Sequence, residues 1–202
     1  ITASGVNIIM NTSLQQYGGD TAIGAYGIIN SVATLFVMLI IGLCQGMQPI
    51  VGYNYGANRL ERMRKAFRLT VEVATVFTTV GFLSVLLFPE TIARAFTTDN
   101  ELLAVSAHGL RTVLFAFPIV GFQIVTTNFF QSIGMASKSI FLSLSRQVLF
   151  LIPLLLFFPR LWGLNGIWMA SPTSDVIATL VTLVLLFHQR HIFKARSQEN
   201  IP

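Results

Sequence analysis

The chain alternates long apolar runs with short polar stretches, a pattern that predicts transmembrane helices. The apolar runs cover residues 1–16, 21–51, 65–88, 103–133, 140–158 and 164–187. All but the first approach or exceed the roughly 20 residues that cross a bilayer as a helix. The first run is shorter, and we expect it to be part of a span whose start lies upstream, in a fragment of a longer protein.

Helices rather than strands are expected because backbone groups in lipid must find hydrogen-bond partners within their own segment. The predicted fold class is therefore all-α integral membrane, with a six-helix transmembrane bundle in residues 1–188 and a polar cytoplasmic tail in residues 189–202.

Composition supports a membrane protein over a soluble one. Hydrophobic residues make up 53% of the chain and charged residues 10%, whereas soluble domains carry about 25% charged residues. The net charge of +5 does not indicate nucleic acid, because the basic residues gather beside helix ends, where anionic membrane lipids are the expected partners. The lone cysteine, Cys44, excludes a disulfide within the chain.

Charge placement gives an orientation. Alternating the loops across the bilayer puts most basic residues on one side: Arg59, Arg62, Arg64, Lys65, Arg68, Lys138, Arg190, Lys194 and Arg196. The other side receives two basic and four acidic residues: Arg94, Arg160, Asp20, Glu90, Asp99 and Glu101. Cytoplasmic loops collect Lys and Arg, so we expect a multi-pass protein with a cytoplasmic C-terminus.

Polar side chains at membrane depth are candidates for a substrate cavity, because such residues usually face a bundle interior or water. Asn7, Asn11 and Gln15 recur every four residues and share one helix face. The remaining candidates for the cavity wall are Asn30, Gln123, Asn128 and Gln131. The alternative is that these residues form interhelical hydrogen bonds with no contact to substrate.

Four charged residues fall within the apolar runs: Asp175, Arg146, Glu72 and Arg111. We expect buried charges that either form ion pairs or couple ion movement to transport. Asp175 lies near the middle of the last helix, where a carboxylate suits Na⁺ or H⁺, and Arg146 on the preceding helix is the candidate for a structural ion pair instead.

The sequence contains no signature of a soluble enzyme. It has no nucleophile elbow, no phosphate-binding glycine-rich loop with lysine, and no Cys/His ligand cluster. His188 and His191 in the tail are too sparse for a metal site. We therefore expect neither an enzyme nor a resident cofactor or metal.

Three stretches resemble the multidrug and toxic compound extrusion (MATE) family. QGMQPIVGYNYGANRLERMRKAFR, residues 45–68, is similar to a family segment where a helix meets the cytoplasm. FFQSIGMASKSIFLSLSRQVLFLIP, residues 129–153, resembles a later helix turn, and GLNGIWMASPTSDVIATL, residues 163–180, resembles the last helix. The stretches occur in the family's order and spacing.

The resemblance implies the C-terminal lobe of a twelve-helix, two-lobe transporter of the bacterial inner membrane. It implies a cation-coupled antiporter that exchanges Na⁺ or H⁺ for cationic or amphipathic drugs, with membrane lipids and the N-terminal lobe as partners. Some family members carry coupling acids on the first and fourth helices of this lobe, and neither run has an acid here. The coupling site is thus expected in the other lobe. The alternative is a related flippase for lipid-linked saccharides, which needs a basic cavity to hold pyrophosphate.

Overall fold

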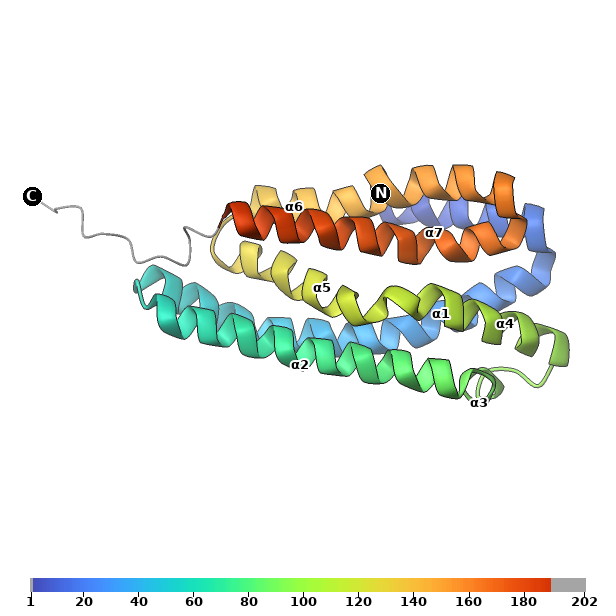
Figure 1. The fold of residues 1–202 in the computed structure, drawn as a ribbon, viewed down its shortest axis with the longest axis horizontal. Coiled ribbons are helices and arrows are strands. Elements are labelled where there is room, and N and C mark those ends of the chain that lie inside the picture. The colour runs from blue at the N-terminus through green and yellow to red at the C-terminus, as the bar shows by residue number, and fades with distance from the viewer. Residues whose placement is uncertain (1, 190–202) are drawn as a thin grey trace, which may run out of the picture.

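The structure is a computed structural model that describes residues 2–189. Every regular element in this range is a helix, and the helices run side by side along one axis (Figure 1). Four helical stretches are long and apolar enough to cross a membrane: Gly5–Gly56, Leu60–Leu87, Asn100–Ser132 and Ala136–His188. The all-α membrane fold class is confirmed. Of the tail expected in residues 189–202, only Gln189 is among the described residues.

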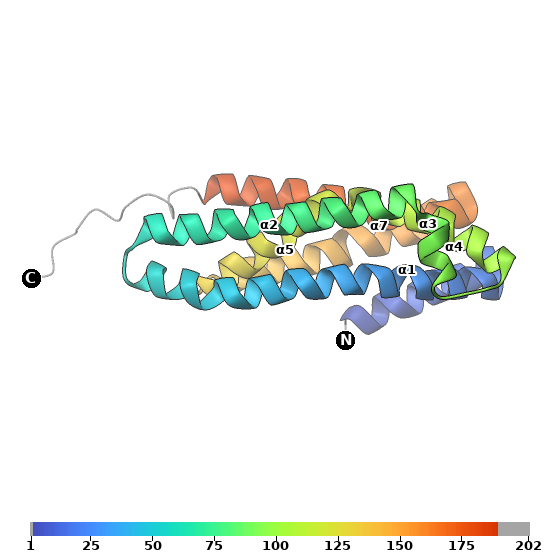
Figure 2. The ribbon, with the colours of Figure 1, turned by 90° about the horizontal axis from the view of Figure 1, so that it is seen from below.

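Two of these stretches fold back on themselves at a glycine. Gly19 in α1 (Thr2–Gly56) has φ 63° and ψ −159°, and Gly163 in α7 (Ile152–His188) has φ 56° and ψ −135°. A positive φ strains residues that carry a Cβ, which is why glycine occupies both positions. We call the two halves of each helix its first and second arm: residues 2–18 and 20–56 of α1, and residues 152–162 and 164–188 of α7. Counting arms separately gives six rods (Figures 1 and 2).

The second reversal differs from the sequence prediction, which ended a helix at residue 158 before Pro159. The helix continues past Pro159 and reverses at Gly163. The two arms approach closely enough that a Cβ on Gly166 would overlap the carbonyl of Phe158. The reversal thus depends on two glycines, one for its backbone angles and one for its close approach.

The helix predicted for residues 65–88 begins earlier, because α2 spans Leu60–Leu87. Its first turns are highly charged and therefore do not look like a membrane span. Leu60, Met63 and Phe67 are nevertheless buried, and their spacing of three and four residues places them on one helix face. The charged residues between them remain exposed, so the expected polar loop is the amphipathic start of a helix.

The single helix predicted for residues 103–133 consists of three elements. These are α4 (Asn100–Val113), the 3₁₀ turn η1 (Leu114–Ala116) and α5 (Phe117–Ser132). Asp99 caps α4, and its side chain accepts a hydrogen bond from the Glu101 amide at 2.9 Å. The interruption directly precedes Pro118, which cannot donate a backbone hydrogen bond to the preceding turn. A short helix that was not predicted, α3 (Pro89–Arg94), leads into this segment.

The helix predicted for residues 140–158 is likewise composite. It consists of α6 (Ala136–Leu144), a π-helix η2 (Ser145–Leu151) and the first arm of α7. A π-helix closes its hydrogen bonds over five residues instead of four, and the amide of Ile152 accordingly bonds the carbonyl of Gln147. Pro153 lies just beyond and cannot supply the α-helical bond to Leu149, which accounts for the wider turn here.

The core centres on α5, which packs against α1, α2 and α7. Leu14, Ile29 and Trp168 are among the buried side chains near the glycine reversals, whereas Met63 and Phe129 belong to a second cluster nearer the start of α2. Large apolar side chains are also exposed on the outer surface, including Leu35, Val76, Phe157, Val184 and Phe187. Such a surface fits lipid as the surrounding solvent, and the protein is a multi-pass membrane protein.

The two ends of the bundle differ in charge. The turn between α1 and α2 and the turn between α5 and α6 lie at one end, which we call the basic end (Figure 1). It carries the cluster of arginines in residues 59–68 together with Lys138. The opposite end, which we call the hairpin end, holds both glycine reversals and α3 (Figure 1). The map of alternating loops drawn from the sequence places the same residues together.

Candidate functional site

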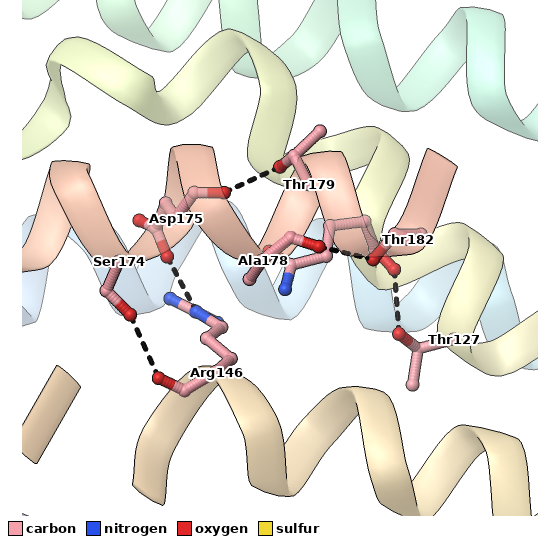
Figure 3. A network of polar contacts seen from close by, with 8 residues as sticks. Thr127, Arg146, Ser174, Asp175, Ala178, Thr179 and Thr182 are labelled. Atoms are coloured by element: carbon pink, nitrogen blue, oxygen red, sulfur yellow. Dashed lines mark hydrogen bonds and ion pairs between the residues drawn. The ribbon is translucent and has the colours of Figure 1, made fainter. Parts of the chain in front are cut away.

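An ion pair links two neighbouring rods in the interior of the bundle. Nε of Arg146, on the π-helix, donates to Oδ1 of Asp175 on the second arm of α7 at 2.6 Å (Figure 3). The Asp175 side chain is only 10% exposed, and that of Arg146 is 37% exposed. A desolvated carboxylate is costly unless it is paired, so the arginine offsets the burial of the acid.

The π-helix contributes a second contact between the same rods. The hydroxyl of Ser174 donates to the backbone carbonyl of Arg146 at 2.9 Å (Figure 3). A carbonyl oxygen has two lone pairs, so it can accept this bond in addition to one from its own helix. The side chain and the carbonyl of Arg146 thus both contact the second arm of α7. π-Helices of this kind are frequent at functional sites.

The ion pair borders a cavity of about 290 Å³, which we call the upper cavity. Its polar wall comes from both arms of α1, the π-helix and α7: Asn7, Tyr26, Asn30, Thr34, Ser171 and the Arg146–Asp175 pair. Phe117 and Leu114 supply part of the apolar wall. The cavity offers amide and hydroxyl groups for hydrogen bonding, while its one carboxylate already has a cationic partner.

A second cavity of about 330 Å³, which we call the lower cavity, lies on the other side of Arg146. Gln123, Thr127, Asn128 and Ser143 provide its polar wall. Arg146, Gln147 and Val37 line both cavities. Arg146 thus borders both cavities.

Two amides of the lower cavity differ in how they are satisfied. Asn128 accepts a hydrogen bond from Nε2 of Gln48 at 3.0 Å and donates to the carbonyl of Ile124. Gln123 is 3% exposed, and its Oε1 has no hydrogen-bond partner within residues 2–189. The bond between Gln48 and Asn128 is an interhelical hydrogen bond, one of the two roles expected for these residues. Gln123 instead keeps a buried acceptor without a partner in the described part of the chain.

The three polar residues of the first rod do not share one cavity. Asn7 lines the upper cavity, while Asn11 and Gln15 line a surface depression of about 500 Å³ together with Thr12 and Gln16. All of these side chains are exposed on the bundle surface. Residues four apart drift by about 40° around a helix, so a row that begins at the cavity turns outward along the rod.

Three predicted residues lie away from both cavities. Glu72 was expected to be buried, but its side chain is 54% exposed and pairs with Arg68 on the same helix at 2.7 Å. Arg111 was also expected to be buried and is exposed. Gln131 is exposed at the end of α5, where its carbonyl accepts a bond from the amide of Gly134. These corrections have one reason, namely that depth along a helix does not specify which side of the helix a residue occupies.

Sequence reasoning missed several residues of the upper cavity. Tyr26, Thr34 and Ser171 line it, although tyrosine, threonine and serine are too common in membrane helices to stand out. Tyr26, Asn30 and Thr34 are spaced by four residues, the same signal that selected the row beginning at Asn7, and this spacing could have revealed them. Gln147, beside Arg146, gave no periodic signal of its own.

Comparison with known proteins gives consistent matches over most of the chain. The family model described as MatE matches residues 1–156. The multidrug export protein MepA of Staphylococcus aureus (strain MSSA476) is 23% identical over 180 residues, which are 89% of this chain and 39% of MepA. The chain therefore spans about two fifths of the length of this relative.

Solved structures match the whole bundle. The MATE multidrug transporter DinF-BH in complex with rhodamine 6G has a TM-score of 0.83 and 38% sequence identity, covering 96% of this chain and 44% of that one. The outward-facing conformation of a multidrug resistance MATE family transporter has a TM-score of 0.88 at 20% identity, again over 96% of this chain and 44% of the other. The bundle thus has the fold of one lobe of these transporters.

Proposed function

The chain belongs to the MatE family, and from this membership we propose that it forms the C-terminal lobe of a cation-coupled multidrug efflux antiporter. The family match is the observation that carries the proposal. The name of MepA and the complex of DinF-BH with rhodamine 6G support small organic compounds as the exported substrates. Residues 1–188 then act together with an N-terminal lobe of the same polypeptide, in the surroundings of membrane lipids.

The first arm of α1 forms the wall of the substrate path. Asn7, Asn11 and Gln15 are exposed on a surface that is otherwise largely apolar. Amides facing lipid would lose their hydrogen bonds, so a water-filled space between two lobes is the environment that suits them. Asn30 joins this wall at the upper cavity. Transport proceeds by rocking of two bundles around a site near the membrane midplane.

The coupling ion, Na⁺ or H⁺, binds in the N-terminal lobe. The upper cavity contains one carboxylate, Asp175, and Arg146 already neutralises it at 2.6 Å. A cation entering this cavity would have to displace the arginine. In this lobe Asp175 therefore has a structural role, holding the π-helix against α7.

The basic end faces the cytoplasm of a bacterial cell, and the C-terminus lies on that side. The support is the accumulation of arginines in residues 59–68 at this end, which follows the positive-inside rule. Cysteines introduced at Lys138 and at Asp99 in a cysteine-free background test it. A membrane-impermeant maleimide added to intact cells should label Asp99→Cys and leave Lys138→Cys unlabelled until the cells are lysed. The reverse pattern contradicts this orientation.

A flippase for lipid-linked saccharides is less well supported. Such a transporter needs unpaired basic residues in its cavity to hold a pyrophosphate group. The arginine of the upper cavity is engaged with Asp175, and no other Lys or Arg among residues 2–189 lines either cavity.

Export of rhodamine 6G by the full-length protein tests the proposed function. Proteoliposomes that contain the protein should transport this compound when a Na⁺ or H⁺ gradient is imposed and should stop when the gradient is dissipated. A triple variant in which leucine replaces Asn7, Asn11 and Gln15 should transport less of the compound, while the amount of folded protein stays the same. The matched control is Ile8→Leu, an exposed apolar position on the same arm. Transport that is indifferent to both gradients would overturn cation coupling.

A further inference from the structure

A groove on the bundle surface, which we call the α4–α7 groove, lies apart from both polar cavities. It measures about 630 Å³ and runs between α4 with η1 and the second arm of α7, closed on one side by the end of α2. None of its lining residues lines the upper or the lower cavity. Its volume falls in the range of about 300–1,000 Å³ typical of ligand pockets.

The long wall of the groove is apolar and exposed. Phe115 is 68% exposed, Met169 43%, Val176 42% and Leu86 41%. The two hydroxyls that line the groove belong to Thr112 and Thr173, and they donate to the backbone carbonyls of His108 and Met169. The wall therefore offers a ligand mainly van der Waals contact, since neither hydroxyl proton is free to donate to it.

The groove belongs to a lipid-facing side of the bundle. On the second arm of α7 the exposed stripe continues from Val176 through Leu180 to Val184, which are 42%, 57% and 70% exposed. This spacing of four residues keeps one helix face apolar over more than two turns. The exposed amides of the first arm of α1 lie on a different rod, and none of them borders the groove.

One end of the groove is positively charged. Arg111 lines it, is exposed, and forms no ion pair or hydrogen bond within the described part of the chain. Its neighbour His108 places Nε2 3.0 Å from Oδ1 of Asn165, a residue that follows the Gly163 reversal almost directly. This contact locates the charged end close to the hairpin end of the bundle, and therefore close to a membrane surface.

The direction of the Arg111 side chain agrees with this position. Helical side chains lean toward the N-terminus of their own helix, and α4 begins at the hairpin end. A long arginine side chain can therefore extend its guanidinium group toward the headgroup layer while its methylene groups stay in the apolar region. The apolar wall continues from there toward the middle of the membrane.

We propose that the α4–α7 groove binds an anionic phospholipid from the leaflet at the hairpin end. Its phosphate pairs with Arg111, and one acyl chain lies along Phe115, Met169 and Val176. An unpaired guanidinium group selects a planar or tetrahedral oxyanion, with which it forms two parallel hydrogen bonds. The exposed apolar wall favours a ligand that also carries a hydrocarbon chain. A phospholipid combines both and is supplied by the membrane itself.

A photoactivatable phosphatidylglycerol with a diazirine in its acyl chain tests the site in the full-length protein. After irradiation in detergent micelles, peptides that contain Phe115, Met169 or Val176 should carry the label. Arg111→Gln should lower this labelling about fivefold, the effect of one basic residue on anionic lipid binding. The matched control is Arg160→Gln, which makes the same charge change at an exposed position three residues before Gly163 and outside the groove.

A second variant keeps the test independent of the charge. Val176→Trp fills the groove from an exposed position, so it should abolish labelling at Phe115 while the protein remains monodisperse. Equal labelling by the phosphatidylcholine analogue, or unchanged labelling in Arg111→Gln, would overturn the proposal. Competition by free glycerol phosphate at concentrations similar to the lipid would also overturn it, since the acyl chain would then contribute nothing.

Transport of rhodamine 6G is measured in parallel, and its absence in the unmodified protein would refute the proposed function without affecting the lipid result.

Discussion

Replacing Arg146 with glutamine leaves the carboxylate of Asp175 without a cationic partner, although its side chain is only 10% exposed. Removing one partner of a buried ion pair destabilises a protein by about 3–5 kcal/mol. Because solvent hardly reaches the Asp175 carboxylate, we expect Arg146→Gln to lower the free energy of unfolding by about 5 kcal/mol, the upper end of this range. For a cooperative unit of about 200 residues that corresponds to a melting temperature lower by about 10–20 °C, and the shift is smaller if the full-length protein unfolds as one unit.

The reverse substitution should cost less. Asp175→Asn leaves the guanidinium group of Arg146 without an anionic partner, but that side chain is 37% exposed and borders two cavities. Water in either cavity can solvate it, so we expect a loss of about 3 kcal/mol, at the lower end of the range. The double variant removes both charges and should be no worse than Asp175→Asn alone, because neither charge is left unpaired.

The assay is heating of the purified full-length protein in detergent, followed by measurement of the fraction that stays monodisperse. The three variants and the unmodified protein form a double-mutant cycle, which isolates the interaction of the two side chains. If the losses of the two single variants simply add in the double variant, Arg146 and Asp175 do not stabilise each other. If Asp175→Asn is the more damaging single change, the role assigned to solvation by the cavities is wrong.

Two other predictions concern packing. Gly166→Ala should prevent the protein from folding, because the added Cβ overlaps the Phe158 carbonyl and backbone cannot move aside as a flexible side chain can. The yield of monodisperse protein measures this effect. The control is Gly56→Ala, which should be tolerated because the added Cβ meets nothing within 4 Å. Gln48→Leu should destabilise the protein by about 0.6 kcal/mol, the mean value for hydrogen bonds between membrane helices, because it removes the donor to Asn128 at 3.0 Å. A gain in melting temperature for Gln48→Leu would show that this hydrogen bond is not stabilising.

Long apolar helices could be predicted because membrane helices have an unusually strong compositional signal, and the described residues contain four stretches long and apolar enough to cross a membrane. The sequence located the first reversal at residues 17–20, where two adjacent glycines interrupt an apolar run, and Gly19 makes that turn. It left residues 159–163 for the second turn, and the reversal occurs at Gly163, the last of them, rather than directly at Pro159. Proline is the stronger helix breaker in water, but the actual turn needs a positive φ, and Gly163 provides it.

The candidate site was harder to predict than the fold. The proximity of Arg146 and Asp175 followed from one charge on each of two consecutive helices, and the structure places them 2.6 Å apart. The exposure of Glu72 and Arg111 did not follow from their depth in the apolar runs, although each has a polar neighbour one helical turn earlier, Arg68 and His108, that could have indicated it. The π-helix of residues 145–151 has no recognisable sequence signature beyond Pro153, yet it determines where Arg146 points.

The π-helix also makes the length of this segment matter more than its composition. Deleting one residue between Ser145 and Leu151 would restore an ordinary α-helix, because a π-helical turn holds one residue more than an α-helical turn. The helices on either side would keep nearly their present faces, but the wide turn that positions Arg146 would be lost. A deletion in the α-helical residues outside this segment would instead rotate one side of the rod by about 100° relative to the other.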